Sequence, residues 1–129
     1  MGNEGVLVVD DNPDNLLLTK FLLRSQEFEV RTAEDAEQAL EVLTTFRPLL
    51  ILMDIQLPGI DGLELTRQLR ADLTWRDVII VALTAYAMKG DEDNAFAAGC
   101  NGYITKPVNT RTFASLVLDY YHRKPDQDR

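Results

Sequence analysis

Cysteine is nearly absent from this sequence, which contains Cys100 and no other, so no internal disulfide can form. That composition fits a reducing compartment such as the cytosol. No apolar run approaches the roughly 18 residues that a membrane-spanning helix needs, and no basic segment followed by an apolar one marks a signal peptide at the N-terminus. We therefore expect a cytoplasmic protein that does not enter a membrane.

Basic residues are also in short supply, since 13 Lys and Arg stand against 21 Asp and Glu and give a formal net charge of −8. This charge argues against a chain that itself grips the phosphate backbone of a nucleic acid. A bound cation or a basic partner surface is more compatible with it. The length of 129 residues suits a single domain, with a core over about residues 5–121 and a polar tail over residues 123–129.

The sequence predicts β-strands of two kinds. Continuous apolar runs bounded by turn residues are typical of strands buried on both faces, and they occur at Gly5–Val9, Leu49–Met53 and Val78–Leu83. Residues 28–32 alternate apolar and polar side chains, which predicts a half-covered strand at a sheet edge. Tyr103–Thr105 is expected to form a short last strand.

Helical patterns separate these strands. Asn12 is expected to cap the first helix, which has Pro13 at its first position and ends at about Gln26. The last helix is expected from about Asn109 to Tyr121. The apolar stripes of the helices are, in chain order, Leu16, Leu17, Phe21 and Leu22; Ala36, Ala39, Leu40, Leu43 and Phe46; Leu63, Leu65 and Leu69; Ala95, Phe96 and Ala98; Phe113, Leu116, Val117 and Tyr120. Strands that alternate with helices predict a parallel α/β fold.

Polar residues stand where the buried strands end. Asp10 and Asp11 follow the first strand, Asp54 the third, Thr84 the fourth and Lys106 the last. In a parallel sheet these residues converge on one edge, where ligands of such folds bind. Crowded carboxylates require a compensating cation or proton, and Mg²⁺ prefers carboxylate and carbonyl oxygens. A carboxylate can also act as a nucleophile that forms an aspartyl phosphate, with nearby positive charge and hydroxyl groups to neutralise the phosphoryl oxygens.

Four segments occur in order at these strand ends: VLVVDDN (6–12), ILMDIQLPGIDG (51–62), VALTA (81–85) and YITKP (103–107). Together they resemble the receiver domain of two-component response regulators, over about Gly5 to Tyr121. The resemblance implies a doubly wound, five-stranded parallel sheet of flavodoxin-like order 2-1-3-4-5, with helices on both faces. It also implies a phosphorylation-activated signalling switch, not an enzyme acting on other substrates, that accepts its phosphoryl group from a histidine kinase or a histidine phosphotransfer protein.

The resemblance implies a role for each acidic residue of the site. Asp54 is the expected phosphoacceptor, and Lys106 would pair first with its carboxylate and then with the phosphoryl oxygens. Asp11, Asp54 and the backbone carbonyl of Gln56 would bind Mg²⁺, or Mn²⁺ in its place, while Asp10 would act mainly through water.

Further residues are implied to switch or to tune the site. Thr84 would move to bond the phosphoryl group, and Tyr103 would change its rotamer with it. The peptide bond before Pro107 is expected to be cis. Gln56 and Tyr86 occupy loop positions that, in the family, tune the lifetime of the acyl phosphate.

The resemblance also predicts partners. The signal is expected to leave through the face formed by the fourth helix, the last strand and the last helix, around residues 89–98, Tyr103 and residues 109–120. His122, the only histidine, lies at the frayed end of the last helix, so the phosphohistidine donor must be another protein. Because the chain ends without an output domain, we expect a stand-alone receiver; a receiver cut from a hybrid histidine kinase or a longer regulator is the alternative.

Other classes of function compete with a switch. A phosphatase of the haloacid dehalogenase type would carry a second Asp two residues after its nucleophile, where this chain has Gln56. A flavodoxin-like cofactor domain would hold a flavin phosphate in a loop that here carries Asp10 and Asp11, whose charges repel it. A degenerate receiver that serves only as an interaction module would not need the complete acidic set. The acidic set therefore favours the switch.

Overall fold

The computed structural model of the chain describes residues 5–26, 28–57, 59–84, 90–106 and 109–122. The strands are β1 (Gly5–Val9), β2 (Glu29–Ala33), β3 (Leu50–Asp54), β4 (Ile79–Thr84) and β5 (Gly102–Thr105). The helices are α1 (Pro13–Arg24), α2 (Ala36–Leu43), α3 (Gly62–Ala71), α4 (Asp91–Ala98) and α5 (Phe113–Tyr121). The predictions for Tyr86, for a cis bond before Pro107 and for a tail over residues 123–129 lie outside the described residues.

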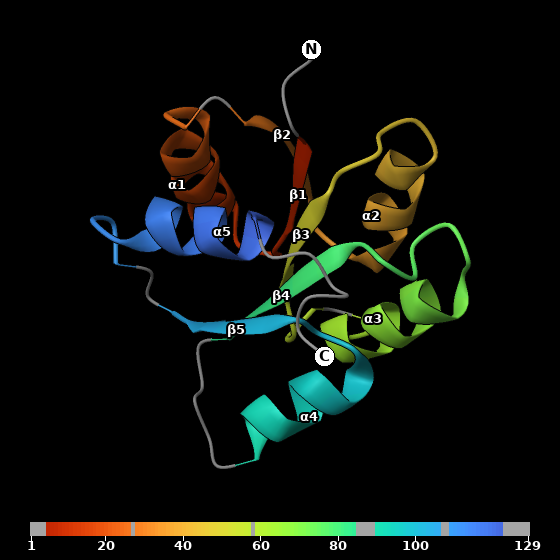
Figure 1. Cartoon of the computed structure of the whole chain (residues 1–129). Helices are drawn as coiled ribbons and strands as arrows, with labels where there is room; N and C mark the ends of the chain where they lie inside the picture. Colours follow the sequence, from red (N-terminus) through yellow and green to blue (C-terminus); the bar gives the residue numbers. More distant parts are fainter. Residues whose placement is uncertain (1–4, 27, 58, 85–89, 107–108, 123–129) are drawn as a thin grey trace.

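The described strands form one parallel sheet of order β2-β1-β3-β4-β5 (Figure 1), which confirms the predicted order. The inner strands β1, β3 and β4 are buried along their whole length, as their continuous apolar runs predict. The edge strands β2 and β5 mix buried with exposed side chains. The sheet order places β1 beside β3, so their ends meet near the middle of one sheet edge.

Two layers of helices cover the sheet (Figure 1). Side chains of alternate strand residues point to opposite faces, so Val6 and Val8 pack with α1 and α5, whereas Leu7 and Val9 pack with α2, α3 and α4. Full burial of a Leu or Ile side chain stabilises a fold by roughly 1.5–3 kcal/mol. The two apolar layers thereby fix the strands that carry the polar residues at their ends. No helix in the described ranges is long and apolar enough to cross a membrane.

Short polar side chains start the helices that follow the strands. The Oδ1 atom of Asn12 accepts hydrogen bonds from the backbone N–H of Asp14 at 2.9 Å and of Asn15 at 3.3 Å, and Pro13 begins α1, as predicted. Asp35 and Asp61 cap α2 and α3 in the same way, accepting from residues three positions on at 2.8 Å. These caps fix the loops next to the strand ends.

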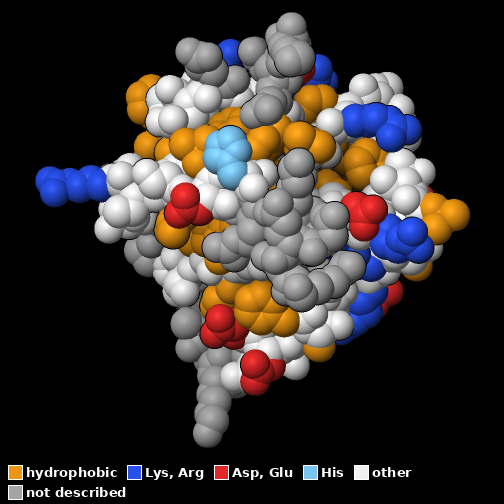
Figure 2. Space-filling view, viewed as in Figure 1, with side chains coloured by type: hydrophobic (Ala, Val, Ile, Leu, Met, Phe, Trp, Pro, Cys, Tyr) orange, Lys and Arg blue, Asp and Glu red, His pale blue; other side chains and the backbone are white. Residues whose placement is uncertain are grey.

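The predicted apolar stripe of α1 is only partly correct. Leu16 is buried and Leu22 is half-buried, but Leu17 and Phe21 are 71% and 72% exposed. The buried positions of α1 are Leu16, Thr19 and Leu23. Leu17 and Phe21 lie four residues apart and form a second stripe that faces away from the sheet. Apolar side chains thus remain at the surface, and Figure 2 shows hydrophobic groups exposed at several places on the face that it presents.

The last helix starts later than predicted. Asn109 does not lie in α5, which begins at Phe113. Its Oδ1 atom accepts a hydrogen bond from the backbone N–H of Arg111 at 2.9 Å, which is the local bond of an Asx turn. The Asn109 carbonyl also accepts from the backbone N–H of Thr112 at 3.1 Å and of Phe113 at 2.8 Å, so a turn from Asn109 leads into α5.

A half-buried arginine, which the sequence patterns did not single out, ties three segments together. The guanidinium group of Arg70 on α3 donates to the carbonyl oxygens of Trp75, Arg76 and Val78 at 3.1, 3.0 and 2.7 Å. It also donates to the Gly99 carbonyl at 2.9 Å and to Oδ1 of Asn101 at 2.7 Å. Burial lowers the pKa of Arg70. Arg70 therefore holds the end of α4 and the start of β4 against α3.

Candidate functional site

The site lies where the strands end. Asp54 is the last residue of β3 and Thr84 the last of β4, while Asp10 and Lys106 follow directly after β1 and β5. All strand pairs are parallel, so these ends share one edge of the sheet. One step beyond the last β1–β3 pair, the register places Asp10 beside Asp54. The predicted convergence of these residues is therefore present.

Strand alternation divides the site residues between the two faces. Asp10, Asp54 and Lys106 continue the positions that face α1 and α5. Thr84 and Tyr103 continue or occupy the positions that face α2, α3 and α4, and Tyr103 packs half-buried against that layer. Thr84 is fully buried. The carboxylates and Lys106 therefore lie on one face of the sheet, and the predicted switch residues Thr84 and Tyr103 lie on the other. The two groups approach each other at the strand ends.

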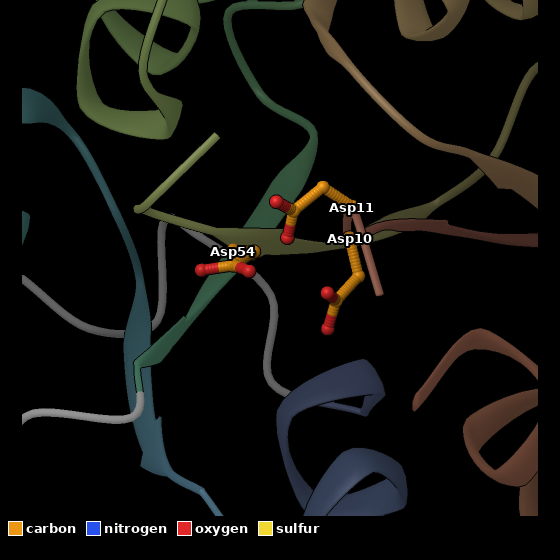
Figure 3. A group of neighbouring side chains, drawn as sticks. All are labelled: Asp10, Asp11 and Asp54. Carbon is orange, nitrogen blue, oxygen red and sulfur yellow. The ribbon is translucent and has the colours of Figure 1, made fainter. Parts of the chain in front are cut away.

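Three carboxylates cluster at this edge. Asp10, Asp11 and Asp54 each offer an oxygen, and these oxygens lie within 4.8 Å of one another. Figure 3 shows Asp10 and Asp11 coming from the end of one strand and Asp54 from its neighbour. Asp10 and Asp54 are buried, whereas Asp11 is exposed. The cluster is thus partly buried, and it is open to solvent on the side of Asp11.

Backbone amides orient the two buried carboxylates. Oδ1 of Asp10 accepts a hydrogen bond from the backbone N–H of Asn12 at 3.0 Å. Oδ1 of Asp54 accepts one from the backbone N–H of Gln56 at 2.9 Å. Each amide belongs to the residue two positions on, so the turn itself aims the carboxylate. Sequence patterns could not reveal these bonds, because a backbone amide is present whatever the side chain.

Lys106 connects the two buried carboxylates. Its Nζ atom lies 2.8 Å from Oδ2 of Asp10 and 3.0 Å from Oδ2 of Asp54. Its backbone N–H donates to the Thr84 carbonyl at 2.7 Å, which fixes the strand end from which the side chain extends. One ammonium group thus serves two carboxylates, and Asp11 adds a third negative charge that Lys106 does not pair with.

The pKa values of Asp54 and Lys106 are both raised, for different reasons. Burial raises the pKa of Asp54, and this effect exceeds the lowering by the Gln56 amide and by Lys106; the charge of Asp10 raises the pKa further. Burial opposes the charge on Lys106, but the hydrogen bonds and charges of Asp10 and Asp54 outweigh it and raise its pKa. The environment of Asp54 therefore disfavours the ionised form of its carboxylate.

These residues fit a hard divalent cation. Carboxylate oxygens are the ligands that Mg²⁺ prefers, and within the described site one ammonium group pairs with two of the three carboxylates, those of Asp10 and Asp54. The exposed Asp11 leaves one side open for water ligands. A cation bound there would offset the excess negative charge that burial makes unfavourable.

The remaining predicted site residues are placed as follows. Gln56 is exposed and lies two residues beyond Asp54, where β3 ends. Tyr86 and Pro107 lie outside the described residues. Cys100 is buried, as predicted for a small packing residue, and His122 is an exposed residue at the end of α5.

Comparisons with known proteins agree with this arrangement. Residues 6–118 match the family model of the response regulator receiver domain. The chain is 38% identical over 117 residues to the polar-differentiation response regulator DivK of Brucella anthropi, across 91% of this chain and 95% of that protein. That relative is therefore itself hardly longer than the matched region.

Solved structures give the same result for the fold. The receiver domain of the sensor histidine kinase PA1611 from Pseudomonas aeruginosa PAO1, with a magnesium ion coordinated in its active site cleft, superimposes with a TM-score of 0.84 at 35% identity, covering 95% of this chain and 100% of that one. A CheY-like receiver domain protein from Methanospirillum hungatei JF-1 superimposes with a TM-score of 0.84 at 28% identity, covering 93% and 94%.

Proposed function

Because the chain belongs to the response regulator receiver family, a family of signalling switches, we propose that Asp54 accepts its phosphoryl group from a histidine kinase or a histidine phosphotransfer protein. The observation that carries this proposal is the position of Asp54. Its carboxylate is buried at the end of β3, oriented by the Gln56 amide and next to the Lys106 ammonium group. These are the fixed charges and donors that phosphoryl transfer requires, since its catalysis is mostly positioning and charge neutralisation.

The chemical step uses the residues as they stand. A carboxylate oxygen of Asp54 attacks phosphorus, the bond from phosphorus to the donor imidazole nitrogen breaks, and the imidazole keeps the electron pair. Lys106 remains at the site and neutralises the phosphoryl oxygens as it now neutralises the carboxylate. Burial raises the pKa of Asp54, whereas the Gln56 amide and the Lys106 ammonium group lower it and so stabilise the ionised carboxylate that attacks.

We propose that Asp11, Asp54 and the backbone carbonyl of Gln56 hold Mg²⁺, with Asp10 acting through water. Asp10 already has Lys106 at 2.8 Å, whereas Asp11 is exposed and has no such cation within the described site, which supports Asp11 as the direct ligand. When bound, the ion supplies positive charge for the carboxylates and the phosphoryl oxygens. Mn²⁺ suits the same oxygen ligands.

The donor protein must place its phosphohistidine over Asp54, so it must touch the rim of the site. Helix α1 starts at that rim, directly after Asn12. Leu17 and Phe21, with the basic residues Lys20 and Arg24, line a surface hollow of about 460 Å³ on this helix. We propose that the donor docks there, with apolar contacts to the first pair and acidic groups facing the second.

The response is proposed to leave through the face of α4, β5 and α5. Thr84 lies at the site and shares a sheet face with Tyr103, so a hydrogen bond from the Thr84 hydroxyl to the phosphoryl group would free space toward Tyr103. Phe96 on α4 and Leu116 on α5 are exposed on this face and could contact a protein target. The roles of Gln56 and Tyr86 in acyl phosphate lifetime, and a cis bond before Pro107, remain predictions from the family.

We further propose a cytoplasmic, single-domain regulator that does not itself bind nucleic acid. The net charge of −8 supports the last point. A relative hardly longer than the matched region supports a stand-alone receiver, whereas the likeness to a receiver from a sensor kinase keeps the hybrid-kinase alternative in place. An enzyme with an Asp nucleophile lacks support, because Gln56 stands where such phosphatases carry their second Asp.

Phosphotransfer from a phosphohistidine protein tests the proposal. Histidine kinases and phosphotransfer proteins are screened for rapid loss of label to the wild-type chain, and the fastest donor is then used with Phe21→Ser. We expect this variant to slow transfer from the protein donor at least roughly tenfold, as loss of a central apolar contact costs more than ~1.4 kcal/mol. Transfer from acetyl phosphate should not change, because this small donor needs no docking surface.

Leu73→Ser is the matched control, since Leu73 is 79% exposed but lies in the α3–β4 connection away from α1. It should transfer at the wild-type rate from both donors. Failure of every phosphohistidine protein to label a chain that acetyl phosphate does label would contradict the proposed source of the phosphoryl group. Equal slowing by the two substitutions would contradict the docking surface alone.

A further inference from the structure

Helices α2 and α3 both cover the sheet face opposite α1 and α5 (Figure 1), and surface hollows lie along them. Two of these hollows share Leu40. The first, of about 470 Å³, lies between the first turn of α2 and the turn at Gly59 and Ile60. The second, of about 310 Å³, extends along α2 and α3 to Leu69 and Trp75. Together they form the α2–α3 furrow.

Apolar side chains on the rim of this furrow are incompletely covered. Leu40 is 39% exposed although the α2 pattern predicts it as part of the core stripe, and Ile60 is exposed as well. Leu40 lies one residue beyond Ala39, which is fully buried, so it turns toward the furrow and away from the sheet. A partner that covers Leu40 and Ile60 would remove apolar surface from water, which favours binding.

The charges around the furrow are unevenly distributed. Among the described residues that line the first hollow, the charged ones are Asp35 and Glu37, both acidic. The second hollow contains Asp72, but beyond it the guanidinium group of Arg47 lies 5.8 Å from the ring centroid of Trp75. Figure 2 shows Lys and Arg side chains together with Asp and Glu side chains on the side of the molecule that carries α2 and α3. The first hollow is thus the acidic end.

We propose that the α2–α3 furrow binds a short basic segment of a partner protein, with Lys or Arg next to Asp35 and Glu37 and an apolar side chain in each hollow. The charge gradient sets the direction of the segment, because its cations favour the acidic end and its other end lies near Arg47. No residue of the carboxylate cluster lines either hollow, although the first hollow lies at the same edge of the sheet, beside the loops that follow β2 and β3. The proposal therefore stands whether or not Asp54 accepts a phosphoryl group.

Amide chemical shifts of ¹⁵N-labelled protein test it with two synthetic peptides. One peptide has a pair of lysines followed by leucines, and the other has glutamates in place of the lysines. We expect saturable shifts at Leu40, Gly59 and Ile60 with the lysine peptide, and weaker binding of the glutamate peptide. Shifts confined to the carboxylate cluster at Asp10, Asp11 and Asp54, or none that saturate at the furrow, would overturn the proposal.

Charge reversal separates local recognition from bulk attraction to an acidic protein. Glu37→Lys should lower the affinity for the lysine peptide about tenfold, because an attractive pair of charges becomes a repulsive one. It should raise the affinity for the glutamate peptide, because the new lysine attracts the glutamates. Glu41→Lys changes the net charge by the same amount on the same helix, one turn farther along, and is not among the lining residues. It should change either affinity less than about twofold, and equal effects of both variants would refute the site.

The apolar part of the proposal has its own pair of variants. Leu40→Ser should lower the affinity for the lysine peptide roughly tenfold, because it removes an apolar contact. Leu116→Ser on α5 should leave this affinity unchanged, although Leu116 is exposed to nearly the same degree, 41%. Both positions lie at the surface, so both variants should fold, and their amide spectra show directly whether they do. Undiminished binding by Leu40→Ser would show that the peptide does not use the furrow.

Discussion

The Nζ atom of Lys106 lies 3.0 Å from Oδ2 of Asp54, although the two residues are 52 positions apart in the chain. The contact depends on the sheet order, since β3 and β5 flank β4 and all three strands end at the same edge. It also depends on alternation, which turns both side chains toward α1 and α5. Lys106 shares its charge with Asp10 at 2.8 Å, so the site retains an excess of negative charge and is suited to a cation.

The first prediction concerns the two acidic residues after β1. Asp11→Asn should weaken Mg²⁺ binding roughly a hundredfold and Asp10→Asn roughly tenfold, because the first removes a direct ligand and the second a residue that acts through water. Titration calorimetry with MgCl₂ measures both affinities. Equal losses, or the reverse order, would contradict the assignment of Asp11 as the direct ligand.

A second prediction concerns stability without metal. The folded state raises the pKa of Asp54 above its unfolded value, so at neutral pH the ionised carboxylate opposes folding. Asp54→Asn removes that charge and keeps an oxygen that can accept from the Gln56 amide. Thermal unfolding in EDTA should therefore occur at a higher temperature for this variant than for wild type.

The control for this prediction is Asp119→Asn on the exposed surface of α5, which should leave the unfolding temperature unchanged. An unfolding temperature of Asp54→Asn below that of wild type would mean that the Lys106 contact outweighs the burial of the charge.

A third prediction concerns Arg70. Arg70→Met should lower the free energy of unfolding by about 2–4 kcal/mol, because it leaves carbonyl oxygens of Val78 and Gly99 without their charged donor. Arg67→Met on the same helix should cost less than about 1 kcal/mol, since Arg67 is exposed and makes one ion pair, with Glu64 at 3.2 Å. Urea unfolding measures both, and similar values would show that the Arg70 bonds contribute little.

The apolar runs and turn residues were sufficient to predict a parallel α/β fold with polar residues converging at the strand ends, whereas the strand order came from the resemblance to receiver domains. The sequence was insufficient for the outer stripe of α1. The pattern marks Leu17 and Leu16 alike as apolar, and only the packing of the helix on the sheet shows that Leu17 faces solvent. The sequence did not reveal the role of Arg70, because its partners are mostly backbone carbonyls, which every residue has whatever its side chain.

A fourth prediction separates chemistry from switching. Thr84→Ala should still accept a phosphoryl group at Asp54, but it loses a hydroxyl whose bond to a charged acceptor is worth roughly 1.5–3 kcal/mol. That loss changes a two-state equilibrium by about one to two powers of ten. Amide shifts at Tyr103 and on α4 should therefore respond weakly to phosphorylation. The full wild-type shift pattern in phosphorylated Thr84→Ala would show that the coupling does not pass through this hydroxyl.

The most direct measurement of the central claim is the intact mass of the protein after incubation with acetyl phosphate and Mg²⁺. We predict that wild type gains the mass of one phosphoryl group, that hydroxylamine removes it, as expected for an acyl phosphate, and that Asp54→Asn gains none. Labelling of Asp54→Asn to the same extent as wild type would contradict the account, because the phosphoryl group would then reside on another residue.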